Sequence, residues 1–273
     1  TSVMIAVSGG FRVYVAFLLL GVKPEVTICL AMILITYATY TLDRAVKTKE
    51  DEINRRGEES AKRSLALLVV GASLLVAILI LIKQGISPLI AFFPFMIGFA
   101  YSKGIKIGKI SLKLKRSLGI KNIVVAFTWA STICALIYSW AGSYLQLLLI
   151  FAFFFLKSFI NTVICDCRDV KGDSLAGLTT LPVYFGEART KMILQLLHSS
   201  FHLSVIALIL LKLIEFETII LLYSWMAGMI YIPLYANSKK TIFRSAVVHG
   251  EWVHMLMFRS IAIQLSRSAS HSS

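Results

Sequence analysis

The segment VICDCRDVKGDSLAG, residues 163–177, places three aspartates directly after a long apolar run, 144–163. That run is long enough to cross a bilayer as a helix. If the helix continues past the run, Asp166, Asp169 and Asp173 fall on one face, because residues three, four and seven apart are neighbours around an α-helix. Carboxylates on one face repel one another unless a cation lies between them. The segment therefore predicts a helix that leaves the membrane with a cation site at its end.

The whole chain has the composition of a membrane protein. Hydrophobic residues make up 58% of its 273 residues and charged residues only 15%, and its mean hydropathy is +0.80. Soluble globular domains are about 45–50% apolar. A soluble enzyme with a large core would need polar outer faces on its helices, and runs such as 65–82 offer none. We therefore exclude that class.

Nine apolar runs of about 17–22 residues predict membrane-spanning helices. They lie at 3–22, 24–42, 65–82, 86–102, 122–141, 144–163, 192–211, 216–235 and 246–265. The first and last runs carry charged residues, so eight spans are the alternative count. The connections are short or of moderate length and contain no low-complexity insert. We expect an all-α, multi-span transmembrane helical bundle of about nine helices, forming a single domain over 1–273.

Positive charges gather in every second connection of this predicted bundle. The formal net charge is +14, and most of the 28 Lys and Arg residues follow the second, fourth, sixth and eighth runs. By the positive-inside rule, these connections lie on the cytoplasmic side of a cell membrane. The position of the charges favours the lipid bilayer as their partner and gives no reason to expect nucleic acid.

A second acidic cluster follows the second run, on the same predicted side of the membrane. Asp43, Lys47 and Asp51 stand four residues apart and form one helical stripe. Taken alone, this segment is equally well explained as a solvated helix of mixed charge. Paired with the Asp166 cluster it suggests Mg²⁺, which binds one or two carboxylates together with the phosphates of a substrate. The two clusters predict a site for Mg²⁺ and a diphosphate at the cytoplasmic face.

The acidic segment also resembles a known family motif. DCRDVKGDSLAGLTTLPVYFGEART, residues 166–190, is similar to the second aspartate-rich motif of the UbiA superfamily of intramembrane prenyltransferases, D-x-x-D-x-x-x-D followed by Gly and a TLPV…G segment. Residues 100–130 resemble the basic loop between that family's fourth and fifth helices, with Tyr101-Ser102, Lys115-Arg116 and Lys121-Asn122 in place. The resemblance covers most of the chain.

The first motif departs from the family pattern N-x-x-x-D-x-x-x-D. Asp43 stands where Asn is expected, Lys47 stands where Asp is expected, and Asp51 matches. One metal ligand is thus exchanged for a cation. Three explanations stay open: one Mg²⁺ is held instead of two, Lys47 contacts the diphosphate directly, or the chain belongs to a member that has lost activity.

The resemblance implies Mg²⁺-dependent transfer of an isoprenyl or polyprenyl group from its diphosphate to an aromatic or lipid acceptor in the membrane. The implied catalytic residues are Asp43, Asp166, Asp169 and Asp173, and the implied metal ligands are these four and Asp51. The diphosphate-binding residues are expected to be Arg44, Lys47, Lys115, Arg116 and Arg168. Asn161 and Tyr101 are expected in the substrate pocket. A catalytically silent isoprenoid-binding relative is one alternative. A cation-coupled transporter is another, although it should bury ionisable residues near the bilayer midplane, and the acids here cluster at one face.

Polar residues inside two predicted spans need separate explanations. Lys157 is costly within a span, so we expect it to reach the surface or to pair with a carboxylate, and Asn161 lies one turn away on a similar face. His198 and His202 are four residues apart with no carboxylate near them in the sequence. We expect them to be packed or interfacial histidines rather than metal ligands.

Overall fold

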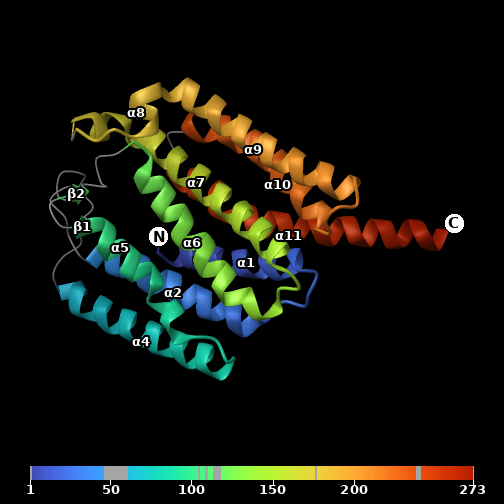
Figure 1. Ribbon diagram of the computed structural model, residues 1–273, viewed down its shortest axis with the longest axis horizontal. Helices are drawn as coiled ribbons and strands as arrows, with labels where there is room; N and C mark the ends of the chain where they lie inside the picture. The colour runs from blue at the N-terminus through green and yellow to red at the C-terminus, as the bar shows by residue number, and fades with distance from the viewer. Residues whose placement is uncertain are drawn as a thin grey trace.

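The computed structural model is a bundle of long helices that run between two ends (Figure 1). It describes residues 2–45, 61–103, 105–107, 110–112, 118–175, 177–237 and 241–272. The long helices are α1 (Ser2–Leu19), α2 (Val26–Ala45), α4 (Ala61–Lys83), α5 (Phe93–Lys103), α6 (Ile120–Ile137), α7 (Tyr144–Leu175), α9 (Glu187–Leu210), α10 (Thr218–Asn237) and α11 (Thr241–Ser272). Every predicted apolar run therefore forms a helix.

The short elements lie in the connections. They are two 3-10 turns (Pro88–Ala91 and Tyr138–Trp140), the five-residue α8 (Leu181–Phe185), and the antiparallel strands β1 (Ile105–Ile107) and β2 (Ile110–Leu112). The hairpin falls within the basic loop, where the sequence predicted no regular structure.

Among the described residues, six helices are long and apolar enough to cross a membrane: α1, α2, α4, α6, α7 and α9. Helix α10 has a shorter apolar part, Thr218–Leu234. The predicted run 86–102 is divided between a 3-10 turn and the 11-residue α5. An 11-residue helix is only about 17 Å long, less than the roughly 30 Å of a hydrocarbon core. The multi-span helical bundle is confirmed. Of the nine predicted spans, the three in α5, α10 and α11 are not among the six that meet these criteria in the described part of the chain.

Helices that follow one another in the chain pack side by side. Helix α1 packs against α2, α2 against α4, α6 against α7, and α9 against α10, while α11 returns to contact both α1 and α10. The C-terminal ends of α2 and α7 lie at the same end of the bundle as the N-terminal end of α6, the hairpin and α8 (left in Figure 1). We call this the motif end and the opposite one the far end.

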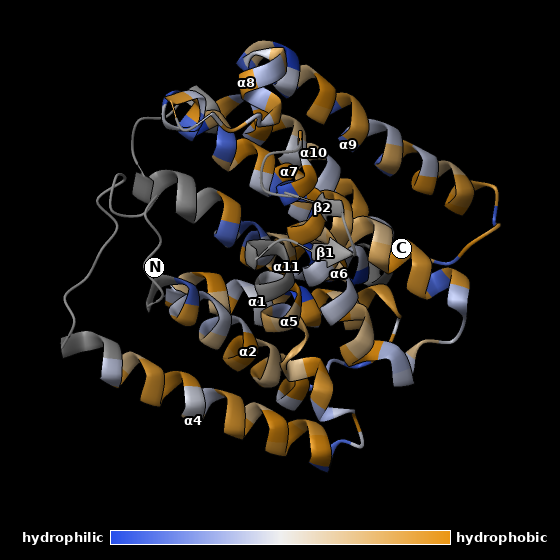
Figure 2. Cartoon of the chain, turned by 60° about the vertical axis from the view of Figure 1, so that its left-hand side comes forward, coloured by the Kyte–Doolittle hydropathy of each residue, from blue (hydrophilic) through white to orange (hydrophobic). Residues whose placement is uncertain are grey.

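The outer helices present apolar side chains to their surroundings, as contact with lipid requires. Figure 2 shows α4 and α9 as hydrophobic over most of their lengths. On these helices Leu68 is 71% exposed, Leu79 57% and Leu196 60%. A surface helix of a water-soluble protein would carry polar side chains at such positions. The chain is a multi-pass membrane protein.

Helices α1 and α2 approach closely through two glycines. A Cβ added at Gly10 would lie 2.5 Å from Cγ1 of Ile33, and one added at Gly9 would lie 2.6 Å from Oγ1 of Thr36. Small residues allow the backbones of membrane helices to come together in this way. The contact fixes the part of α1 that carries Arg12. The guanidinium carbon of Arg12 lies 5.4 Å from the centre of the Trp252 ring.

The two histidines of α9 are buried against α10, as expected from the sequence. Nδ1 of His202 donates to the carbonyl oxygen of His198, and Nε2 of His202 lies 3.0 Å from Oγ of Ser224. Nε2 of His198 donates to the carbonyl oxygen of Ser224 at 3.1 Å. Because a carbonyl oxygen can only accept, the tautomers of both rings follow from these contacts. The two histidines thus connect α9 to α10 through buried hydrogen bonds.

Gly228→Ala is expected to destabilise the protein by about 1–3 kcal/mol, the usual scale of overpacking. A Cβ at Gly228 would lie 2.0 Å from Nε2 of His198, and that ring is held in place by the backbone of α10. The thermal unfolding midpoint of the purified protein in detergent measures the effect. Gly71→Ala on α4 is the matched control, because nothing lies within 4 Å of its added Cβ. Equal shifts in both variants would remove the steric explanation.

Candidate active site

The second aspartate cluster lies on a continuation of α7, as predicted. Helix α7 has 32 residues and includes Asp166, Asp169 and Asp173. A helix of this length measures about 48 Å, so its last turns extend beyond a hydrocarbon core of roughly 30 Å. The aspartates therefore lie at the motif end, past the apolar run that ends at Val163.

Asp166 is held by the first turn of α6. Its side chain is buried, with Nζ of Lys121 at 3.1 Å from Oδ1, and Nδ2 of Asn122 donates to Oδ2 at 2.8 Å. The N-terminus of a helix also favours a nearby negative charge. These two contacts orient the carboxylate and fix α7 against α6. Lys121 and Asn122 occur in the loop that resembles the family, but the sequence did not identify them as partners of Asp166.

Asp169 lies at the surface of the same end. Arg168 donates to both of its carboxylate oxygens, from Nε at 2.7 Å and from a terminal nitrogen at 2.6 Å. Both side chains are about one-third exposed, 32% for Arg168 and 38% for Asp169. A guanidinium group binds phosphate through the same bidentate hydrogen-bond geometry. Arg168, predicted to bind a diphosphate, lies beside the aspartates and directs these two donors to Asp169.

Asp173 has an oxygen that the surrounding protein leaves unsatisfied. Its Oδ2 atom is buried and has no hydrogen-bond partner. Burial, followed by the neighbouring Asp166, raises the pKa of Asp173, whereas Lys121 and the nearby hydroxyl of Thr180 act in the opposite direction. The contact with Thr180 does not meet ordinary hydrogen-bond geometry, because Oδ2 of Asp173 and Oγ1 of Thr180 both lack a partner by that criterion. A carboxylate in this position requires either a proton or a cation. The side chain therefore fits a role as a metal ligand.

The carboxylates of α7 suit a metal that shares its ligands with a substrate. No group of three or more His, Cys, Asp or Glu side chains is close enough to hold a metal alone within the described part of the chain. Mg²⁺ typically takes one or two protein carboxylates and completes its shell with water and phosphate oxygens. Asp173 and the surface-exposed Asp169 fit that requirement, with Asp166 behind them.

The first motif is only partly visible. Asp43 lies near the end of α2, is exposed, and belongs to the same end of the bundle as the α7 aspartates. Arg44 and Tyr101 lie in α2 and α5, but their side chains are outside the description. Lys47, Asp51, Lys115 and Arg116 lie outside the described residues. The structure thus places Asp43 with the second motif and leaves the remaining first-motif and loop assignments as predictions.

Deeper in the bundle, a group of polar side chains joins α7 to α10 and α11. Nζ of Lys157 forms an ion pair with Oε1 of Glu251 and donates to Oη of Tyr231 at 3.2 Å. Tyr231 in turn donates to Oδ1 of Asn161 at 3.3 Å. All four side chains are buried. The expectation that Lys157 pairs with a carboxylate is confirmed, and we call Lys157, Asn161, Tyr231 and Glu251 the interior cluster.

Comparison with known proteins assigns the chain to a family. The model of the UbiA prenyltransferase family matches residues 2–249. The chain belongs to the UbiA prenyltransferase family. The match covers most of the chain, from α1 into α11, so the resemblance seen in the α7 motif extends to the whole bundle.

Solved structures of UbiA homologues share this fold at low sequence identity. The apo structure of a UbiA homologue from Aeropyrum pernix K1 is 14% identical, with 98% of this chain and 99% of that chain covered and a TM-score of 0.60. A UbiA homologue from Archaeoglobus fulgidus bound to GPP and Mg²⁺ is 16% identical over 93% and 96% of the two chains, with a TM-score of 0.60. A digeranylgeranylglyceryl phosphate synthase is 14% identical over 94% and 90%, with a TM-score of 0.53. No curated protein sequence matches the chain.

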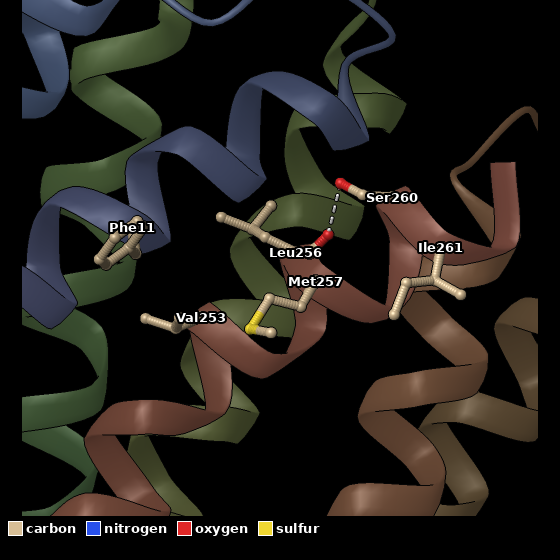
Figure 3. Close-up of a pocket in the computed structure, with 6 residues that line it drawn as sticks. All are labelled: Phe11, Val253, Leu256, Met257, Ser260 and Ile261. Atoms are coloured by element: carbon tan, nitrogen blue, oxygen red, sulfur yellow. Dashed lines mark hydrogen bonds between the residues drawn. The ribbon is translucent and has the colours of Figure 1, made fainter. Parts of the chain in front are cut away.

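In this member of the UbiA family, an apolar groove lies between α1 and α11, away from the aspartates. It comprises two adjoining hollows of about 340 and 380 Å³ that share Phe11 and Val253. Figure 3 shows the first hollow, where Phe11 projects from α1 and the other labelled side chains come from α11. Such a lining suits hydrocarbon and offers no charged side chain to a phosphate. The charged side chains predicted to bind a diphosphate therefore lie at the motif end and not in this groove.

Proposed function

We propose that this UbiA family member transfers an isoprenyl or polyprenyl group from its diphosphate to an aromatic or lipid acceptor within the membrane, with Mg²⁺ as cofactor. The observation that carries the proposal is the α7 aspartate cluster. Asp166 is held by Lys121 and Asn122, while Asp173 keeps a buried oxygen without a partner. Homologues of this fold are described as bound to DMAPP or GPP together with Mg²⁺.

The carboxylates of both motifs would hold the metal, and the cations around them would hold the diphosphate. Asp166, Asp169 and Asp173 act from α7, and Asp43 and Asp51 act from the first motif. Bound Mg²⁺ supplies positive charge that offsets the charge developing on the leaving diphosphate. Arg168, together with Arg44, Lys47, Lys115 and Arg116 of the loops, contributes hydrogen bonds to the same oxygens.

The reaction needs no covalent intermediate on the protein. The allylic C–O bond breaks with its electron pair leaving on the diphosphate, and an electron-rich atom of the acceptor then bonds to the allylic carbon. The acceptor atom releases its proton to the departing diphosphate or to water, so that the products are the prenylated acceptor, diphosphate and one proton. The protein's part is to orient the diphosphate and to offset its charge, which is most effective in a site organised before the substrate arrives. The two contacts that fix Asp166 against α6 provide such organisation.

The basic connections indicate on which side of the membrane the site lies. Helices α2 and α7, which the basic connections follow in the sequence, end at the motif end. The positive-inside rule therefore supports a cytoplasmic site, with the prenyl chain extending into the bilayer. The protein would thus act as a multi-pass enzyme of the cell membrane.

Binding of a non-hydrolysable geranyl diphosphate analogue is expected to require Mg²⁺ or Mn²⁺. The α7 carboxylates alone would repel the diphosphate, whereas a divalent cation joins the two. Titration of the purified protein in nanodiscs, with metal and then with excess chelator, measures the dependence. Unchanged binding in chelator would contradict a metal-bridged site.

Two further measurements, release of diphosphate and cation flux, separate the alternatives. A catalytically silent relative would bind the analogue but release no diphosphate from geranyl diphosphate with any acceptor. A cation-coupled transporter has one feature in its favour, because Lys157 and Glu251 are buried inside the bundle. Cation flux into liposomes, without diphosphate release, would support that function.

A further inference from the structure

Lys121 connects a buried carboxylate to the surface of the motif end. It lies in the first turn of α6, beside the C-terminal part of α7 (Figure 1). Its Nζ atom is 3.1 Å from Oδ1 of Asp166, and its side chain is 54% exposed, whereas that of Asp166 is only 4% exposed. An ammonium group has three N–H donors, so it can keep this contact and donate to a second acceptor. Lys121 is therefore placed to meet a ligand that binds at the motif end.

The carboxylate that holds this ammonium is itself fixed. Nδ2 of Asn122 donates to Oδ2 of Asp166 at 2.8 Å, and Asn122 is only 1% exposed. Asp166 therefore presents Oδ1 to Lys121 in one orientation. A lysine side chain loses much rotamer freedom when a ligand fixes it, and here the ion pair with Asp166 restricts that freedom beforehand. A cation that is positioned before the ligand arrives stabilises negative charge more effectively than a mobile one.

Lys121 also acts on the aspartate whose carboxylate has an unsatisfied oxygen. Oδ2 of Asp173 is buried without a hydrogen-bond partner. The positive charge of Lys121 favours the ionised form of Asp173, whereas the negative charges of Asp166 and Asp169 disfavour it. The protein thus places one positive charge of its own among the three carboxylates of α7. In a site for two metal ions, the second ion would supply that charge.

The ligands available for a second metal ion are also reduced. Lys47 stands where the family pattern has an Asp, so one ligand of the first motif is exchanged for a cation. On α7, both oxygens of Asp166 already accept hydrogen bonds from α6, so a metal ion at Asp166 would compete with Lys121. Asp169 and Asp173 suit one Mg²⁺, which takes one or two protein carboxylates. The two motifs together favour one metal ion with the Lys121 ammonium beside it.

We propose that Lys121 binds the diphosphate of the prenyl substrate, and that its ammonium takes the place of a second metal ion, so that this protein uses one Mg²⁺ per substrate. The inference rests on the proposed function, because it assigns a further residue and the number of metal ions to the same site. Lys121 stays protonated throughout. It donates hydrogen bonds to the diphosphate oxygens and offsets the charge that they gain as the allylic C–O bond breaks.

The number of bound metal ions tests the proposal without any substitution. Mn²⁺ is used in place of Mg²⁺, because electron paramagnetic resonance measures free and bound Mn²⁺ directly. Wild type in nanodiscs of zwitterionic lipid, saturated with the non-hydrolysable geranyl diphosphate analogue, should bind one Mn²⁺ per protein, with the spectrum of an isolated ion. Two ions per protein, or the spectrum of a coupled pair, would overturn the proposal. This measurement decides even if a variant at Lys121 does not fold.

Lys121→Gln tests the residue itself. Glutamine can still donate to Asp166 but carries no charge, and the half-exposed position should tolerate it. Binding of the analogue in saturating Mn²⁺ is expected to weaken by roughly ten- to a hundredfold, the worth of a hydrogen bond from a charged group. Binding of Mn²⁺ without the analogue should be unchanged or tighter, because a nearby positive charge is removed. A purely structural role of Lys121, through the position of Asp166, would instead weaken both.

Lys191→Gln is the matched control, because it also removes one positive charge from the motif end. Lys191 lies near the start of α9 and pairs with Glu187 at 2.8 Å. This variant should bind the analogue as wild type does. Wild-type affinity in Lys121→Gln, equal weakening in the two variants, or weakening of both Mn²⁺ and analogue binding in Lys121→Gln would each overturn the proposal while leaving the proposed function in place. If wild type binds no analogue with any metal, the proposed function fails as well.

Discussion

Replacing Asp169 with asparagine is expected to lower prenyl transfer at least about a hundredfold, the scale of removing one group from an organised charge-stabilising site. Asparagine keeps the size of the side chain but removes the negative charge that would share a metal with the diphosphate. Release of diphosphate from geranyl diphosphate, with a membrane lipid extract supplying the acceptor, measures the loss. Glu215→Gln, in the connection between α9 and α10 at the far end, is the control.

The position of Asp169 makes this test specific. Its side chain is 38% exposed and receives two hydrogen bonds from Arg168, the preceding residue of the same helix, so we expect the substitution to leave the fold unchanged. Asp166→Asn would be less informative, because Asp166 also fixes α7 to α6. A folded Asp169→Asn variant with near-normal turnover would place Asp169 outside the active site.

The α7 aspartates could be predicted because the information is local. An apolar run of spanning length fixes a helix, and the spacing of Asp166, Asp169 and Asp173 within one sequence segment fixes their common face. The same local rule identified the nine long helices of the described residues but not the five-residue α8. It also failed in detail at 86–102, where Pro88 and Pro94 divide the run into a 3-10 turn and the short α5.

The partners of these residues could not be predicted, because they come from distant parts of the chain. Lys121 and Asn122 are 45 and 44 residues from Asp166. Glu251 is 94 residues from Lys157. The sequence predicted that Lys157 would either reach the surface or pair with a carboxylate, but not which of the acids would supply the carboxylate. Pairing of this kind depends on how helices pack, and one sequence does not contain that arrangement in any local pattern.

Glu251 also changes the argument against a transporter. The sequence placed the acids at one face, which favoured an enzyme, yet the structure buries this carboxylate inside the bundle with Lys157. Membership of the UbiA family, rather than the distribution of acids, now supports prenyl transfer. The interior pair joins α7 to α11 and so contributes to the packing of the bundle.

Lys157→Met is expected to destabilise the protein by about 3–5 kcal/mol, the usual cost of leaving one partner of a buried ion pair uncompensated. Lys157 and Glu251 are 1% and 2% exposed at their side chains, so water cannot replace the lost contact. Arg259→Met is the matched control. It breaks the partly exposed pair with Glu217, and such pairs are worth about 1 kcal/mol or less.

The double variant Lys157→Met/Glu251→Leu should recover most of the loss, because an apolar pair of similar size avoids the uncompensated charge. Unfolding in detergent for wild type, both single variants and the double variant gives the coupling energy between the two sites. If the double variant is as unstable as the sum of the single variants, the pair is not coupled, and Lys157 does not position Glu251.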